Sequence, residues 1–214
     1  MLINIIKKIR DRIRYRLVLS YIFERLATIG VDIKPFYFCI KFLPEKIDPN
    51  LEPKLEPLAA NFLSSSEINR IYEHPENKQL MRDNKRLLEE GYRCFGLKYN
   101  DEVVSYLWCN LRRCHEVNPF RLGEDEAYLS GVFTFKAYRG KYLAPFLRYQ
   151  LYQHLTRMGK TKVYTLINIF NTPAIKLNKK LNSKPQKIII NINLFNKYTW
   201  NFMTRFPNRF LITI

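Results

Sequence analysis

The chain has 214 residues, enough for one domain with a sizeable core and an extension. Its hydrophobic content of 47% is ordinary for a globular protein, which argues against a disordered chain and against a bundle of membrane helices. The net charge is +17, and all 19 acidic residues lie at or before Glu126, whereas 15 Lys or Arg follow it. The second half therefore carries a strong positive field, which suits a phosphate-bearing ligand, a nucleic acid or an anionic membrane.

The four cysteines form no C-x-x-C pair, and with three scattered histidines they give no metal-ligand spacing. We therefore expect no metal site. No secretory signal is convincing, and no apolar run reaches the length of a bilayer span. These observations favour a reduced, cytoplasmic protein whose cysteines are small core residues.

Residues 1–29 have the pattern of a basic amphipathic helix. Apolar residues recur at helical spacing from Leu2 to Leu17, and six Lys or Arg flank this stripe. Such borders are typical of a helix that lies on an anionic membrane, which would make the protein peripheral at the inner face. The alternative is a helix docked on its own domain or on a second copy in a homodimer. We treat residues 1–30 as an extension and residues 31–214 as a single domain.

The next elements are read from apolar runs and turn residues. Residues 34–43 predict a first strand, residues 44–57 contain four prolines and are irregular, and residues 58–90 are mostly helical with a break near Pro75. A hairpin is expected from residues 92–99 and 103–113, closed at Asn100 and Asp101. Residues 115–125 form a polar loop that borders the following strand.

In the second half, strands and helices alternate. Apolar runs at residues 127–135 and 162–170 predict strands, and helices are expected before Gly159 and between Asn171 and Asn182. Residues 187–194 and part of residues 200–214 add two more strands. We expect an α/β fold, a mixed twisted sheet with helices on both faces.

The turn between the first of these strands and its helix suits a pyrophosphate. A helix start leaves backbone N–H groups without partners and carries partial positive charge. Gly140 lets the backbone approach a ligand, and Arg139 and Lys141 add charge. The alternative is an ordinary turn with two solvated basic residues.

Together with Asn171 and Ala174 further on, this turn resembles the GNAT family of N-acetyltransferases. The family reads Arg/Gln-x-x-Gly-x-Gly/Ala where this chain runs from Arg139 to Ala144, and Tyr142 stands where the family prefers glycine. The resemblance covers roughly residues 92–195. It implies a GNAT-like fold and a transferase that uses acetyl-CoA or another acyl-CoA. The cofactor-binding residues it implies are Val132, Phe133, Thr134, Arg139, Gly140, Lys141, Tyr142, Leu143, Ala144, Asn171 and Ala174. For Asn171, a helix N-cap is the alternative role.

An amine that attacks a thioester needs proximity, loss of a proton and stabilisation of the charge that develops on the carbonyl oxygen. Glu126 is the candidate base, with His115 and Glu116 as rivals; the amine also has the option of arriving neutral or losing its proton to water. Asn178 stands where the family often has a tyrosine acid, and an amide donates a hydrogen bond to a thiolate without protonating it. Either the thiolate leaves without a dedicated acid, or another residue such as Tyr164 serves as the acid.

The acceptor is not readable from the sequence. By analogy we expect a primary amine of a small molecule, for example an amino sugar in surface-polysaccharide synthesis. An acyl carrier protein, which is acidic and bears the same pantetheine arm, is an alternative donor. Two other functions stay open. One is a catalytically silent CoA-binding or membrane-associated partner protein. The other is a nucleic-acid-binding module, which the core-like apolar runs disfavour because such a module needs exposed aromatics.

Overall fold

A computed structural model describes residues 18–44, 53–77, 81–114 and 120–205, and the side chains of all of these except 81–84. The chain divides into two compact units, which we describe separately. The central unit comprises residues 39–166 and 177–184. The terminal unit comprises residues 1–38, 167–176 and 185–214.

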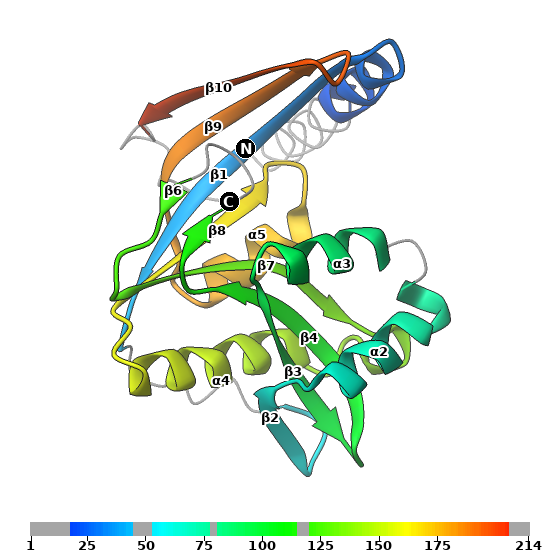
Figure 1. Cartoon of the computed structure of the whole chain (residues 1–214), viewed down its shortest axis with the longest axis vertical. Helices are drawn as coiled ribbons and strands as arrows, with labels where there is room; N and C mark the ends of the chain where they lie inside the picture. Colours follow the sequence, from blue (N-terminus) through cyan, green and yellow to red (C-terminus); the bar gives the residue numbers. More distant parts are fainter. Residues whose placement is uncertain (1–17, 45–52, 78–80, 115–119, 206–214) are drawn as a thin grey trace, which may run out of the picture. The chain divides into compact units, whose positions relative to one another are not determined.

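The central unit is built on a mixed sheet (Figure 1). Antiparallel neighbours in this sheet are, in order, β2 (Leu58–Phe62), β3 (Arg93–Tyr99), β4 (Glu102–Asn110) and β7 (Glu126–Thr134). The next strand, β8 (Lys162–Asn168), runs parallel to β7. The predicted β3–β4 hairpin is confirmed: Asn100 and Asp101 have φ values of 49° and 61°, the left-handed conformation that tight hairpin turns require.

Helix α4 (Leu143–Arg157) covers one face of this sheet. Its leucines at positions 143, 147, 151 and 155 recur every four residues, so they form one stripe, and each is at most 2% exposed. They pack against Phe95, Leu97 and Leu107 of β3 and β4. Burial of each leucine stabilises the fold by about 1.5–3 kcal/mol. The stripe therefore holds α4, and with it the start of the helix, in a fixed position on the sheet.

The other face of the sheet is covered by α2 (Ser65–Glu73), by the short 3₁₀ helix η2 (Pro75–Asn77) and by α3 (Met81–Glu89) (Figure 1). Tyr106, which alternates with Leu107 and so points to this face, donates its hydroxyl to Asn77 at 3.0 Å. Ser64 and Glu67 form a capping box at the start of α2. Because α2 ends at Glu73 and a separate 3₁₀ helix begins at Pro75, the predicted break in the helical region near Pro75 is confirmed.

The terminal unit contains a helical segment at residues 18–28, most of the strand β1 (Val31–Phe42), and a hairpin of β9 (Lys184–Leu194) with β10 (Tyr198–Arg205). Gly30 has a φ of 87°, and a Cβ there would lie 2.5 Å from the Phe195 ring, so a glycine is required. Helix α5 (Thr172–Lys180) begins in this unit. No described helix has the length and apolar content needed to cross a membrane.

Two expectations were wrong in detail. Residues 58–62 are a strand rather than a helix, because they pair with β3 along its outer side, and a pairing so distant in sequence leaves no local signal. The predicted polar loop contains a two-residue strand, β6 (Phe120–Arg121), which pairs with β5 (Arg113–Cys114). Most of the amphipathic stripe and the end of the chain after Arg205 lie outside the described residues.

Candidate functional site

The strand β7 contains a bulge near its carboxyl end. Tyr106 and Trp108 of β4 pair with Phe133 and Ser130, so two residues of β7, Gly131 and Val132, oppose a single residue of β4. Gly131 has a φ of 59°, the left-handed conformation of a glycine bulge. The parallel ladder with β8 ends immediately before the bulge, at Leu129. Val132, Phe133 and Thr134 therefore lie beyond this ladder, and their backbone is re-aimed by the bulge.

After Thr134, the chain turns through the 3₁₀ helix η3 (Lys136–Tyr138) and enters α4. No side chain caps the start of α4, and its first turn contains no acidic residue. Pro145 occupies the first turn, where a missing N–H costs no intrahelical bond. The remaining amides and the helix dipole thus face a ligand position suited to an anion.

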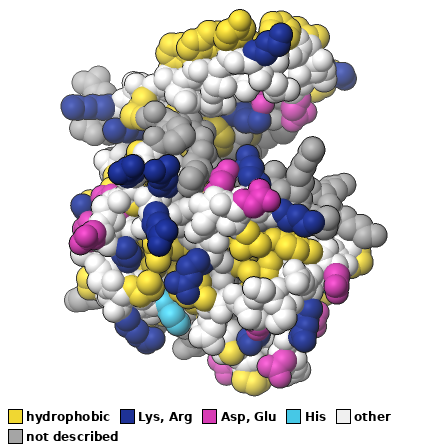
Figure 2. Space-filling view, viewed as in Figure 1, with side chains coloured by type: hydrophobic (Ala, Val, Ile, Leu, Met, Phe, Trp, Pro, Cys, Tyr) yellow, Lys and Arg dark blue, Asp and Glu magenta, His cyan; other side chains and the backbone are white. Residues whose placement is uncertain are grey.

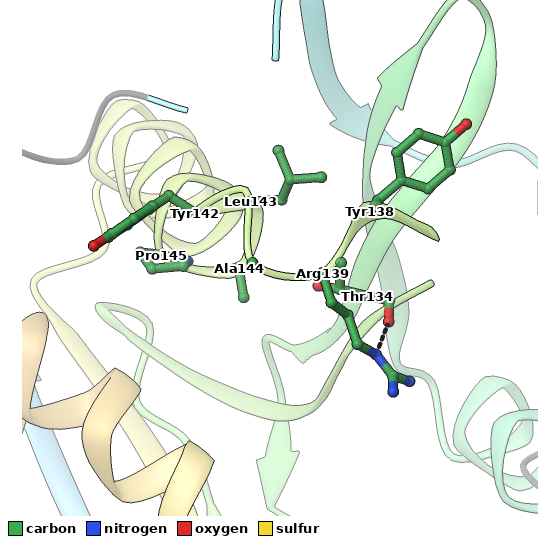
Figure 3. A pocket seen from close by; sticks show the side chains of 8 residues that line it. Thr134, Tyr138, Arg139, Tyr142, Leu143, Ala144 and Pro145 are labelled. Carbon is green, nitrogen blue, oxygen red and sulfur yellow. Dashed lines mark hydrogen bonds between the residues drawn. The ribbon is translucent and has the colours of Figure 1, made fainter. Parts of the chain in front are cut away.

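A pocket of about 460 Å³ lies at this helix start (Figure 3). Its lining residues come from the end of β7, the turn and the first turn of α4: Thr134, Tyr138, Arg139, Gly140, Tyr142, Leu143, Ala144 and Pro145. Gly140 has a φ of 77°, and an added Cβ would meet no atom within 4 Å, so its backbone is open to a ligand. Of the predicted cofactor residues, the structure brings Thr134 and the segment 139–144 together around this pocket, with only Lys141 outside its lining.

Tyr142 shows why glycine is favoured at this position of the turn. It precedes the first helical residue with φ 61° and ψ 17°, the left-handed region. This conformation costs a non-glycine residue about 1–2 kcal/mol. The ring is 43% exposed, and two ammonium groups lie over it, Lys180 Nζ at 3.9 Å from the ring centre and Lys54 Nζ at 5.7 Å. Sequence reasoning assigned neither lysine a role in binding, and Lys54 stands in no recognisable motif.

Arg139 is tied to the end of β7. Its Nε donates to the Thr134 carbonyl oxygen at 2.9 Å, and its Nη2 lies 3.7 Å from Glu76 Oε2. The same carboxylate accepts from the backbone N–H of Lys136 at 3.0 Å. Arg139 therefore holds the turn against the strand, and Glu76, which sequence reasoning also missed, offsets part of its charge. Figure 2 shows Lys and Arg side chains spread over one face of the molecule, with acidic side chains among them.

Glu126 and Tyr164 form a hydrogen-bonded pair at the opposite end of β7. The Tyr164 hydroxyl donates to Glu126 Oε1 at 2.6 Å, the Gly123 N–H donates to Oε2 at 3.0 Å, and Lys162 Nζ lies 3.5 Å away. Burial pushes the pKa of Glu126 up, but these hydrogen bonds outweigh it and leave the pKa lowered. Burial, and then the bond to Glu126, raises the pKa of Tyr164. Thr134 follows Glu126 by eight residue steps along β7, which is roughly 26 Å of extended strand.

Asn178 is buried, with 5% of its surface exposed, and binds a buried arginine. Its Oδ1 accepts from Arg148 Nη1 at 3.1 Å and from Thr165 Oγ1 at 3.2 Å. Arg148 is 2% exposed, and its Nε and Nη2 have no hydrogen-bond partner among the described residues. The Asn178 side chain is therefore one of the few hydrogen-bond acceptors that the Arg148 guanidinium has. The catalytic roles of Asn178, Glu126 and Tyr164 stay predictions.

The sequence was compared with protein families, and residues 61–182 match the Acetyltransferase (GNAT) family. The match covers more than half of the chain. The chain belongs to the GNAT family.

Solved structures agree with this fold. The GNAT chain is similar, at TM-score 0.56 and 12% identity, to a structure of a fungal multi-domain GH3 β-N-acetylglucosaminidase with a glucosamine N-acetyltransferase region, covering 88% of this chain and 23% of that one. It is similar to a tandem GNAT protein of the clavulanic acid pathway at TM-score 0.52 and 14% identity, covering 83% and 57%. A Staphylococcus epidermidis protein of unknown function matches at TM-score 0.52 and 12% identity, covering 80% and 65%. The chain thus spans less than two thirds of each of these structures. No curated protein matches it in sequence.

Other predicted residues of this GNAT chain lie in the terminal unit or outside the described range. Asn171 Oδ1 accepts from the Ala174 N–H at 3.1 Å, which is the N-cap geometry that the sequence left as an alternative. Its contact with a pantetheine arm stays a prediction, as does that of Ala174. His115 and Glu116 lie outside the described residues. Among the described residues, no three His, Cys, Asp or Glu side chains gather as a metal site would require.

Proposed function

We propose that the chain transfers an acyl group, most simply acetyl, from acyl-CoA to a primary amine of a small molecule. One observation carries the proposal: the β7 bulge at Gly131 and Val132 is followed, one turn later, by the uncapped start of α4. The first feature offers re-aimed backbone groups to a thioester, and the second offers amides to a pyrophosphate. GNAT family membership supports both assignments.

Different groups of residues bind different parts of acyl-CoA. The amides from Gly140 to Ala144 and the dipole of α4 hold the pyrophosphate. The backbone of Val132 to Thr134 binds the pantetheine arm, and a backbone N–H near the bulge stabilises the negative charge that develops on the thioester oxygen. Phe133 is partly exposed and its ring centre lies 5.2 Å from that of the buried Phe135, so it gives this end of the strand an apolar surface.

The chemistry balances without a metal. The amine nitrogen attacks the thioester carbon, the C–S bond breaks, the thiolate leaves, and the attacking nitrogen loses one proton. A thiol with a pKa near that of cysteine, about 8.5, is a fairly good leaving group, so a dedicated acid helps without being essential. We assign Glu126 as the base to be tested first and Asn178 or Tyr164 as the group that assists the thiolate.

The acceptor is proposed to be an amino sugar. A structural relative carries a glucosamine N-acetyltransferase region, and the cationic second half suits an acceptor that is itself anionic, such as a sugar joined to a nucleotide diphosphate in surface-polysaccharide synthesis. Residues 1–29, with their apolar stripe and its basic borders, would hold such an enzyme near an anionic membrane. Two alternatives stay open: the acyl donor is an acyl carrier protein instead of CoA, and the protein forms a homodimer.

The test is release of free thiol from acetyl-CoA in the presence of a panel of amines: glucosamine, a nucleotide-linked amino sugar, a polyamine and an aminoglycoside. We expect turnover with at least one amino sugar and none in a Gly140→Trp variant, whose side chain fills the open space beside the turn. Tight CoA binding with no turnover on any amine would favour a silent CoA-binding protein. Absence of CoA binding would overturn the proposal.

A further inference from the structure

Two lysines lie over the Tyr142 ring at the start of α4, and a third lies over Tyr138. Lys54 and Lys180 lie over the Tyr142 ring at 5.7 and 3.9 Å, and Lys141 Nζ lies 5.3 Å from the Tyr138 ring centre. The backbone N–H of Lys54 donates to the Lys141 carbonyl oxygen at 3.1 Å, which ties the segment before β2 to the turn. Within the part of the chain that the structure describes, none of the three ammonium groups forms an ion pair.

This arrangement has a cost that calls for a compensating gain. The like charges of Lys54 and Lys180 repel each other, and the Tyr142 backbone is in a conformation that glycine adopts without strain. The ring gives a reason for tyrosine, since the negative face of an aromatic ring attracts ammonium groups and holds Lys54 and Lys180 beside each other. A cluster of unpaired cations held in this way is complementary to a compact dianion.

The side of the turn on which the cluster lies identifies the dianion. In Figure 3, Tyr142 points to the opposite side of the turn from Arg139 and Thr134. A pantetheine arm that runs from the helix start toward the β7 bulge leaves on the Thr134 side, so the nucleoside end of the same molecule must leave on the Tyr142 side. In CoA that end carries a phosphate monoester on the ribose, with a charge of about −1.5 to −2 at pH 7.

We propose that Lys54 and Lys180, held over the Tyr142 ring, bind the ribose 3′-phosphate of CoA and so make the site selective for CoA. The inference rests on the proposed function and deepens it. A phosphopantetheine arm on a carrier protein and 3′-dephospho-CoA both lack this monoester, so both are weaker ligands. The donor is therefore a free acyl-CoA rather than an acylated carrier protein. Tyr142 acts as a positioning residue, since it touches the lysines and not the reacting atoms.

The experiment is calorimetric titration of the full chain with CoA and with 3′-dephospho-CoA at two salt concentrations. We expect the wild type to bind CoA about ten- to thirtyfold more tightly than dephospho-CoA at low salt, with a smaller ratio at high salt. In a Lys54→Met, Lys180→Met double variant the ratio should fall to about two- to threefold, chiefly through weaker CoA binding. Tyr142→Phe should keep the wild-type ratio, because it keeps the ring, whereas Tyr142→Gly should lower it.

A matched control removes the same charge elsewhere. Lys85 on α3 is exposed, and Lys160 follows the far end of α4, so a Lys85→Met, Lys160→Met double variant should keep the wild-type ratio. Equal binding of CoA and dephospho-CoA by the wild type would overturn the inference and leave the proposed function standing. A ratio unchanged in the Lys54, Lys180 variant, or lowered equally in the control, would also overturn it. Failure of the wild type to bind either nucleotide would overturn the proposed function itself.

Discussion

Replacing Asn178 by alanine should destabilise the fold more than it harms the chemistry. The substitution removes the acceptor of two buried hydrogen bonds, one from the charged Arg148 guanidinium and one from the Thr165 hydroxyl. A buried bond to a charged group contributes about 1.5–3 kcal/mol and a neutral one about 1 kcal/mol, so we expect a loss of about 2–4 kcal/mol. That is a large part of the stability of an ordinary domain, roughly 5–15 kcal/mol. Asn178→Asp keeps an oxygen acceptor for Arg148 and should lose less at pH 7.

Urea unfolding measures the difference, followed by the fluorescence of the buried Trp108. Asn61→Ala, at an exposed position of β2, is the matched control and should stay within about 0.5 kcal/mol of the wild type. An Asn178→Ala variant within about 1 kcal/mol of the wild type would refute the reasoning. Turnover measured well below the unfolding transition tests the predicted catalytic role separately: help to the thiolate predicts a rate lower by about tenfold, and a purely structural role predicts an unchanged rate.

Three further outcomes follow from the same contacts. Tyr142→Gly should be more stable than Tyr142→Ala by about 1 kcal/mol in urea unfolding, because only glycine relieves the left-handed backbone; the reverse order would show that no strain is stored there. The N–H of the cap residue and the Lys98 ammonium lower the pKa of Glu67 from 4.5 to about 2, so the stabilisation by Glu67 is fully present above pH 4.5 and is lost as pH falls toward 2. The urea midpoint of Glu67→Gln should therefore fall less between pH 4.5 and pH 2 than that of the wild type, and parallel pH curves for the two proteins would contradict this prediction. Glu76→Gln removes the carboxylate beside Arg139 and should tighten CoA binding about two- to threefold by calorimetry, an effect typical of one exposed charge pair, so weaker binding would argue against the anion site.

The parts of the fold that the sequence predicted well are those with local signals. The hairpin at Asn100 and Asp101 follows from turn chemistry, and α4 follows from leucines spaced four apart. The helix start was also predictable, because strand, glycine and helix follow one another directly. The bulge at Gly131 also has a local signal, since an isolated glycine inside an apolar strand is typical of a bulge.

What the sequence did not predict depends on contacts between distant segments. β2 is a strand because it pairs with β3 more than thirty residues later, and Lys54 lies nearly ninety residues before the Tyr142 ring that it meets. The buried Asn178–Arg148 contact is of the same kind, since neither residue type is typical of a core. Motif reasoning placed Asn178 by its position in a pattern, whereas its surroundings follow from packing.

How the attacking amine loses its proton is the step on which Glu126 can be tested. Its pKa is lowered, and Oε1 already accepts the Tyr164 hydroxyl, so at neutral pH it is an ionised carboxylate with little tendency to take up a proton. If the amine loses its proton to water instead, kcat/KM should rise with pH along the titration of the amine itself, and should shift when an amine of lower pKa is used. Glu126→Gln would then keep the same profile, and it would lose the stability that the ionised carboxylate contributes at neutral pH. A fall in kcat/KM of a hundredfold or more across the pH range, with the fold intact, would instead establish Glu126 as the base despite its distance along β7 from the bulge.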